Sequence, residues 1–141
     1  MKTVLFVCIH TSARSQMAES FVNGRCAGKL QAFSAGIEHG TLNPVVVEVM
    51  REMKYDISTN ATKSVDQPEI RSRSYDYVAT VCDEASAEAC PIYPTSGARL
   101  HWSFPDPSSF EGDREARLAR TRVVRDEIAD QIDTWCADVC R

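Results

Sequence analysis

A cysteine and an arginine six positions apart flank a short loop near the start of the chain, in the stretch CIHTSARS at residues 8–15. The stretch follows an apolar run, KTVLFV at 2–7, and a helical pattern begins at Arg14. In such a loop, backbone N–H groups and the helix N-terminus favour a bound anion. The Arg14 guanidinium can hold a tetrahedral oxyanion through two hydrogen bonds. The spacing therefore predicts an oxyanion-binding loop.

Cys8 is the nucleophile that this arrangement suggests. The positive field of the loop is expected to lower the pKa of the Cys8 thiol, and the Ser15 hydroxyl can donate a hydrogen bond to the sulfur. A thiolate beside a bound oxyanion is suited to covalent catalysis. The alternative is a buried structural cysteine before a helix, and the strand–loop–helix context favours the catalytic interpretation.

The elements that would position these residues alternate along the chain. Strands are predicted at 2–7, 31–36, 75–81 and 99–104, and helices from Arg14 toward Gly28, from Asn43 and Pro44 onward, and from about Arg114 to the end. This alternation predicts an α/β domain over residues 1–141 with a parallel sheet covered on both faces. In the last helix, five residues mark a buried stripe: Val124, Ile128, Ile132, Trp135 and Val139.

Three chemically active side chains each follow one of these strands, namely Cys8, Cys82 and Asp106. The carboxyl ends of parallel strands lie along one edge of the sheet, where open α/β sheets bind their ligands. The sequence thus predicts that the three side chains share one site.

Bulk properties narrow the partners and the compartment. The net charge of −4 argues against a nucleic-acid binder, and no segment has the length of a membrane span or a signal peptide. We therefore expect a cytoplasmic protein without a membrane partner. Six cysteines in a cytosolic domain indicate metal binding or redox catalysis, and the absence of a CxxC motif makes a structural metal site improbable.

Two stretches carry a resemblance to a known family. VLFVCIHTSARSQMAES and HWSFPDPSSF resemble the N-terminus and the acid loop of the low-molecular-weight protein tyrosine phosphatase superfamily. The resemblance implies a three-layer sandwich with a four-stranded parallel sheet flanked by helices. It also implies that Asp106 is the general acid and that a phosphatase-like loop binds the oxyanion, through residues Cys8, Ile9, His10, Thr11, Ser12, Ala13 and Arg14.

Thr11 departs from the family pattern, which usually has asparagine in a left-handed conformation at this position. A β-branched residue in that conformation is an outlier. Thr11 therefore predicts either a less pre-organised loop or a different loop conformation.

A third stretch, VCDEASAEACPIYP, distinguishes the branches of the superfamily and resembles the thiol-coupled arsenate reductases. The resemblance implies that Cys8 attacks arsenate, that Cys82 then attacks Cys8, and that Cys90 finally forms a disulfide with Cys82. Because eight helical residues span about 12 Å and a disulfide needs Cα atoms within about 7 Å, residues 83–90 would have to unwind.

No bound cofactor is implied for this relay, only an external thiol reductant. A thioredoxin-like protein is favoured, with glutathione and glutaredoxin as the alternative, and phosphate or sulfate are expected analogues of arsenate. The competing functions are a low-molecular-weight phosphatase and a non-catalytic oxyanion-binding or thiol-sensing module. The remaining cysteines, Cys26, Cys136 and Cys140, are expected to be packing thiols.

Overall fold

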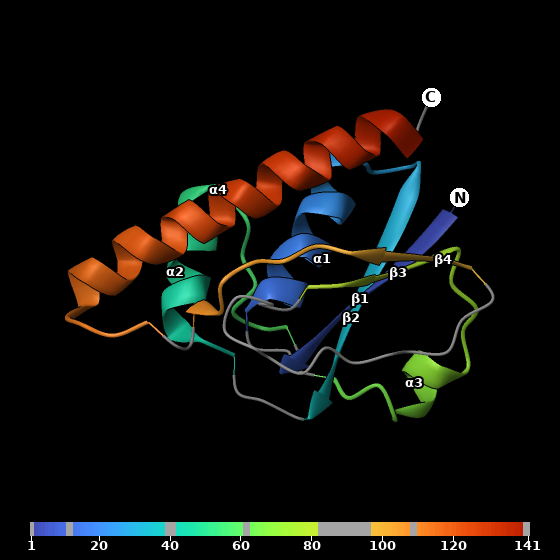
Figure 1. Cartoon of the computed structure of the whole chain (residues 1–141), viewed down its shortest axis with the longest axis horizontal. Helices are drawn as coiled ribbons and strands as arrows, with labels where there is room; N and C mark the ends of the chain where they lie inside the picture. The colour runs from blue at the N-terminus through green and yellow to red at the C-terminus, as the bar shows by residue number, and fades with distance from the viewer. Residues whose placement is uncertain are drawn as a thin grey trace.

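A parallel sheet organises the protein in the computed structural model, which describes residues 2–10, 13–38, 42–60, 63–81, 97–107 and 110–139 (Figure 1). Within these ranges the sheet has four strands in the order β2-β1-β3-β4. The strands are β1 (Lys2–His10), β2 (Leu30–Glu38), β3 (Tyr77–Thr80) and β4 (Ala98–His101). All three neighbouring pairs are parallel, which confirms the predicted sheet.

The described helices cover both faces of this sheet. They are α1 (Arg14–Arg25), α2 (Pro44–Glu52), α3 (Pro68–Arg71) and α4 (Arg114–Val139). In Figure 1, α1, α2 and α4 lie on one side of the sheet and the short α3 lies on the other, so the predicted three-layer architecture is confirmed. None of the described helices combines the length and the apolar character that a membrane crossing requires.

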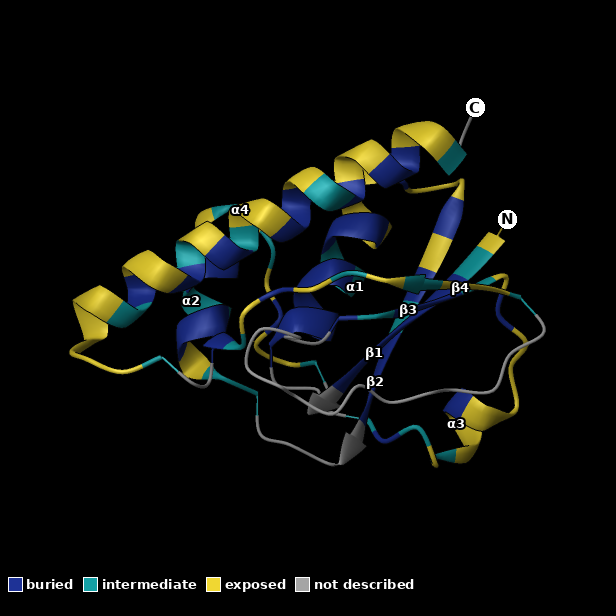
Figure 2. Cartoon of the chain, in the orientation of Figure 1, coloured by how far each residue is buried: buried dark blue, intermediate teal, exposed yellow. Residues whose placement is uncertain are grey.

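The alternation of side chains along β1 divides the core between the two faces. Phe6 and Cys8 belong to the larger core cluster, together with residues of α1, α2 and α4. Leu5 and Val7 belong to a smaller cluster with Ile70 of α3. Because β1 is buried on both faces, it lies at the centre of the fold, as the dark blue ribbon in Figure 2 shows.

Strand boundaries differ from the predictions at the edge that carries the site. β1 extends to His10 rather than ending at residue 7, because β2 continues to pair with it through Cys8↔Gly36 and His10↔Glu38. β4 ends at His101 rather than at residue 104, although the Trp102 amide still donates to the Thr80 carbonyl.

The predicted helix signals are confirmed where the structure describes them. The Asn43 side chain caps α2 by accepting a hydrogen bond from the Val45 amide at 3.0 Å, and Pro44 takes the first helical position. In α4 the predicted stripe is buried from Val124 to Trp135, and Val139 is half-buried against the core.

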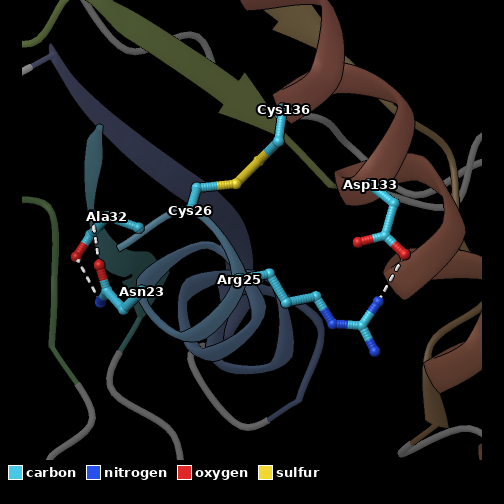
Figure 3. Close-up of a disulfide and its surroundings, with 6 residues drawn as sticks. All are labelled: Asn23, Arg25, Cys26, Ala32, Asp133 and Cys136. Atoms are coloured by element: carbon cyan, nitrogen blue, oxygen red, sulfur yellow. Dashed lines mark hydrogen bonds and ion pairs between the residues drawn. A yellow bond between two sulfur atoms is a disulfide. The ribbon is translucent and has the colours of Figure 1, made fainter. Parts of the chain in front are cut away.

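The prediction for Cys26 and Cys136 is wrong, because the two residues form a disulfide with a Cα–Cα distance of 6.5 Å (Figure 3). Cys26 is the residue that ends α1, and Cys136 lies near the end of α4. No local pattern in the sequence links Cys26 to Cys136, which is why both were predicted to be packing thiols. The two cysteines lie 110 residues apart and are brought close by the packing of α1 against α4.

We expect Ile128→Ala to lower the free energy of unfolding by about 2–5 kcal/mol, because Ile128 is fully buried in α4 and truncation leaves a cavity. Val123→Ala is the matched control, since Val123 lies on the same helix and is 57% exposed. The control should change stability by no more than about 0.5 kcal/mol. Urea denaturation measures both variants, and equal losses would contradict the assignment of this helix face to the core.

Candidate functional site

Cys8 lies inside the carboxyl-terminal part of β1, with its side chain fully buried. Gly36 of β2 is its partner on one side of the sheet. On the other side the chain of β3 continues to Val81, whose amide donates to the Val7 carbonyl at 2.9 Å. Cys8 is therefore flanked by Gly36 and Val81, and Val81 directly precedes Cys82 in the sequence.

The first turn of α1 brings two predicted site residues to Cys8. The Cys8 sulfur and the Ser15 hydroxyl oxygen lie 3.1 Å apart in a buried hydrogen bond. Ala13 caps the helix, and its carbonyl accepts the first helical hydrogen bond from the Met17 amide at 3.0 Å. Because this turn packs into the core, every residue from Arg14 to Ala18 is buried.

The segment after β4 contacts Arg14 and therefore also lies beside Cys8. The Arg14 Nη1 donates to the Phe104 carbonyl at 3.3 Å, and its Nη2 lies 3.7 Å from the Asp106 carboxylate. The Arg14 side chain is 2% exposed and the Asp106 side chain is 24% exposed. The structure thus brings Asp106 to Cys8, Arg14 and Ser15, although it lies more than ninety residues further along the chain.

Burial raises the pKa of the Cys8 thiol above its ordinary value, which contradicts the expected lowering. The hydrogen bond to the Ser15 hydroxyl, the charge of Arg14 and the hydrogen bond to the Ser15 backbone lower this pKa, and the charge of Asp106 raises it further. Removing a thiolate from water costs more than these three favourable contacts return. The positive groups around Cys8 are visible in the sequence, whereas the depth of its burial depends on the folded structure.

Several predicted site residues lie outside the described part of the chain, namely Thr11, Ser12, Cys82 and Cys90. Ile9 and His10, two of the residues predicted to bind the oxyanion, are the last two residues of β1. The connection between β1 and α1 is therefore residues 11–13, shorter than predicted, because strand pairing continues through His10.

Sequence reasoning missed two polar residues on α1 beside the site. Gln16 is 1% exposed, and its side-chain oxygen accepts a hydrogen bond from Asn60 at 3.1 Å. Glu19 lies one turn further, where burial raises the pKa of its carboxyl and contacts with Ser34 and Lys63 lower it. The only sequence signal was the lack of a clearly polar face in the first turns of α1.

The described residues contain no group of three or more His, Cys, Asp or Glu side chains placed to hold a metal ion. The chemistry that the described site offers is that of a buried thiol, a guanidinium and a carboxyl group. These groups suit nucleophilic attack on a bound anion with protonation of a leaving group.

We expect Ser15→Ala to raise the pKa of Cys8 further, because the variant loses the hydrogen bond that lowers it. The pH dependence of Cys8 alkylation by iodoacetamide, followed by mass spectrometry, should shift to higher pH. Ser20→Ala is the control on the same helix and should leave the profile unchanged. A profile that stays in place in Ser15→Ala would show that this hydroxyl does not favour the thiolate.

Residues 3–141 match the family of low molecular weight phosphotyrosine protein phosphatases. An arsenate reductase of Halalkalibacterium halodurans is 39% identical over 134 residues, covering 95% of this chain and 94% of that protein. An arsenate reductase of Bacillus licheniformis is 41% identical over 131 residues, covering 93% and 92%. A solved arsenate reductase in the phosphate binding state superposes with a TM-score of 0.78 at 27% identity, covering 99% of both chains. The chain therefore belongs to the low molecular weight phosphotyrosine protein phosphatase family, and its relatives there include arsenate reductases.

Proposed function

We propose that this protein reduces arsenate to arsenite and that it does so with thiol chemistry centred on Cys8. The observation that carries the proposal is the contact of the buried Cys8 thiol with Ser15, next to an Arg14 guanidinium that pairs with Asp106. The match to arsenate reductases over more than nine tenths of the chain supports arsenate as the substrate. Phosphate, which a solved relative binds, has the same tetrahedral oxyanion shape.

In the first step the Cys8 sulfur bonds to arsenic. The thiol proton passes to the Asp106 carboxylate, which delivers it to a hydroxyl group of arsenate, so that this group leaves as water and a Cys8–arsenate adduct forms. Arg14 and the backbone amides of residues 9–13 hold the anion, and Ser15 donates to the sulfur as it becomes charged. Because burial raises the pKa of the Cys8 thiol, this step needs a group that accepts the thiol proton, and Asp106 is the group placed to do so.

Asp106 is the proposed general acid for that departing oxygen. Its carboxyl group lies at the rim of the site, 24% exposed, while Arg14 beneath it is almost fully buried. This placement leaves the carboxyl within reach of both bulk water and the anion held by Arg14. A carboxylate in this position can accept the thiol proton and pass it to the departing oxygen.

The second step transfers two electrons from sulfur to arsenic. Cys82 attacks the Cys8 sulfur, the electron pair of the sulfur–arsenic bond stays with arsenic, and arsenite leaves as a Cys8–Cys82 disulfide forms. Cys90 then attacks Cys82, which restores the Cys8 thiol and leaves a Cys82–Cys90 disulfide. The position of Val81 beside Cys8 supports this relay, because Cys82 is the next residue along the chain.

An external dithiol restores the enzyme by reducing the Cys82–Cys90 disulfide. We propose a thioredoxin-like protein as this dithiol, since a protein with two thiols can attack one sulfur and resolve the mixed disulfide with its second thiol. Glutathione with glutaredoxin is the competing donor. A cytoplasmic location follows from the same proposal, because the relay depends on a reducing thiol pool.

Hydrolysis of aryl phosphates is the second candidate function, and the family to which the chain belongs favours it. Nucleophile, guanidinium and general acid serve both reactions. Only the reductase needs Cys82 and Cys90, so substitution of a relay cysteine separates the two functions.

We expect Cys82→Ser to reduce arsenate turnover by roughly a hundredfold or more, because the reduction draws electrons from Cys82. Hydrolysis of p-nitrophenyl phosphate should stay within about twofold of the wild-type rate, because it does not need Cys82. Arsenite formation is measured with thioredoxin and its reductase, and in parallel with glutathione and glutaredoxin. Cys140→Ser is the control that keeps both activities. Full arsenate turnover by Cys82→Ser with either donor would overturn the relay.

We expect Asp106→Asn to reduce kcat for arsenate by roughly 10²–10⁴-fold, the range for loss of a general acid. The same variant should lower the pKa of Cys8, because the Asp106 charge raises it. Glu111→Gln, an exposed carboxyl in the same connecting segment, is the control. A normal kcat together with a lowered pKa of Cys8 would leave Asp106 only an electrostatic role and contradict the assignment.

A further inference from the structure

The disulfide between Cys26 and Cys136 joins the end of α1 to α4 (Figure 3), and Arg14 lies at the opposite end of α1. Arg14 begins the helix and Cys26 follows its last residue, so about 18 Å of helix separates them. A disulfide requires Cα atoms within about 7 Å, so neither Cys26 nor Cys136 can exchange with Cys8 while the protein is folded. The disulfide is therefore separate from the chemistry of Cys8.

Both cysteines are shielded from solvent, Cys26 at 5% and Cys136 at 8% exposure. Thiol–disulfide exchange needs an attacking thiolate to reach a sulfur atom and form a mixed disulfide, so its rate depends on access. An attacking dithiol would supply two electrons and two protons and would itself become a disulfide. Burial of both cysteines opposes the first attack of that sequence.

The disulfide supplements a contact between α1 and α4 that has little other polar support in the described part of the chain. Beside it, Arg25 pairs with Asp133 at 2.6 Å, with side chains 29% and 52% exposed. Exposed ion pairs of this kind contribute little to stability. The disulfide instead joins residues 110 positions apart and restricts the unfolded chain strongly.

Aromatic packing connects Cys136 to the segment that carries Asp106. Its neighbour Trp135 packs edge-on against Trp102, with ring centroids 5.5 Å apart, and Trp102 in turn contacts Phe6 at 5.9 Å. Trp102 begins the segment that leads to the Phe104 carbonyl and to Asp106, the two partners of Arg14. Cys26 is connected to the same pair through α1, which carries Arg14 at its other end.

We propose that Cys26–Cys136 is a structural disulfide, distinct from any catalytic relay, that stays oxidised in the folded protein under dithiol reductants. It holds the far ends of α1 and α4 together. Through α1 on one side and the Trp135–Trp102 contact on the other, the disulfide holds the Arg14 guanidinium and the Asp106 carboxylate close enough to pair. Cys26 and Cys136 are positioning residues, since neither touches the reacting groups.

Alkylation mapping of the wild-type protein tests the persistence of the disulfide. The protein is incubated with reduced thioredoxin or dithiothreitol, treated with iodoacetamide, and digested for mass spectrometry. We expect Cys26 and Cys136 to remain unlabelled in the native protein and to become labelled only when reductant is added in denaturant. Labelling of both cysteines in the native protein within minutes would overturn the proposal.

The variant Cys26→Ala/Cys136→Ala tests the structural role, with Cys140→Ala as the control that keeps the disulfide. We expect the double variant to lower Tm by on the order of 10 °C, from the usual contribution of a disulfide that closes a long loop. The fluorescence of Trp102 and Trp135, the only tryptophans in the sequence, should change with it. An unchanged Tm and spectrum would contradict a structural role.

Kinetics of the same double variant separate positioning from participation in a relay. Positioning predicts a KM for arsenate raised several-fold with multiple turnovers retained. Loss of multiple turnovers with an unchanged Tm would assign the pair to the relay and overturn the proposal. The labelling and Tm measurements need no arsenate, so their outcome does not depend on the proposed reductase activity, and the labelling result holds even if the double variant does not fold.

Discussion

The Arg14 guanidinium is the buried charge around which the site is organised. At 2% exposure it has lost its hydration, and an uncompensated charge at that depth would cost several kcal/mol. The Phe104 carbonyl and the Asp106 carboxylate supply the compensation, which draws the segment after β4 toward the first turn of α1. An oxyanion that enters the site would bring negative charge to the same guanidinium.

Burial acts differently on anion binding by Arg14 and on the neighbouring Cys8 thiol. It strengthens the attraction between Arg14 and an anion, since charges interact more strongly away from water. The same loss of water raises the pKa of Cys8, despite the hydrogen bond from Ser15. Burial and the contacts with Ser15 and Arg14 thus act in opposite directions on the pKa of the Cys8 thiol.

α1 transmits this arrangement to the rest of the fold. Its first turn carries Arg14 and Ser15, its middle buries Met17 and Phe21 against β1, and the disulfide at Cys26 attaches its end to α4. One rigid helix thus connects the reacting edge of the sheet to the longest helix of the protein. This connection explains how a crosslink far from Cys8 can influence the position of Arg14.

Much of this organisation was predictable from local patterns. The alternation of apolar strands with amphipathic helices predicted the parallel sheet, and the Asn43–Pro44 pair predicted the start of α2. Because parallel strands share one carboxyl edge, the positions of Cys8 and Asp106 after or near strand ends were enough to predict that they meet. Arg14 and Ser15 followed from their spacing to Cys8 at the start of a helix.

Three features required the tertiary structure. The extension of β1 to His10 depends on pairing with β2, which is not encoded within β1 itself. The direction of the Cys8 pKa shift depends on how much water the surrounding core excludes, a property of all the elements packed on that edge. The Cys26–Cys136 pairing depends on the closeness of α1 and α4, because the two cysteines are 110 residues apart in the sequence. Residue type and short spacing are local, so the sequence was sufficient to predict Cys8, Arg14, Ser15 and Asp106 as candidate site residues. Burial and long-range contacts arise from the whole fold, so only the packing shows how deeply these residues are buried and what holds them.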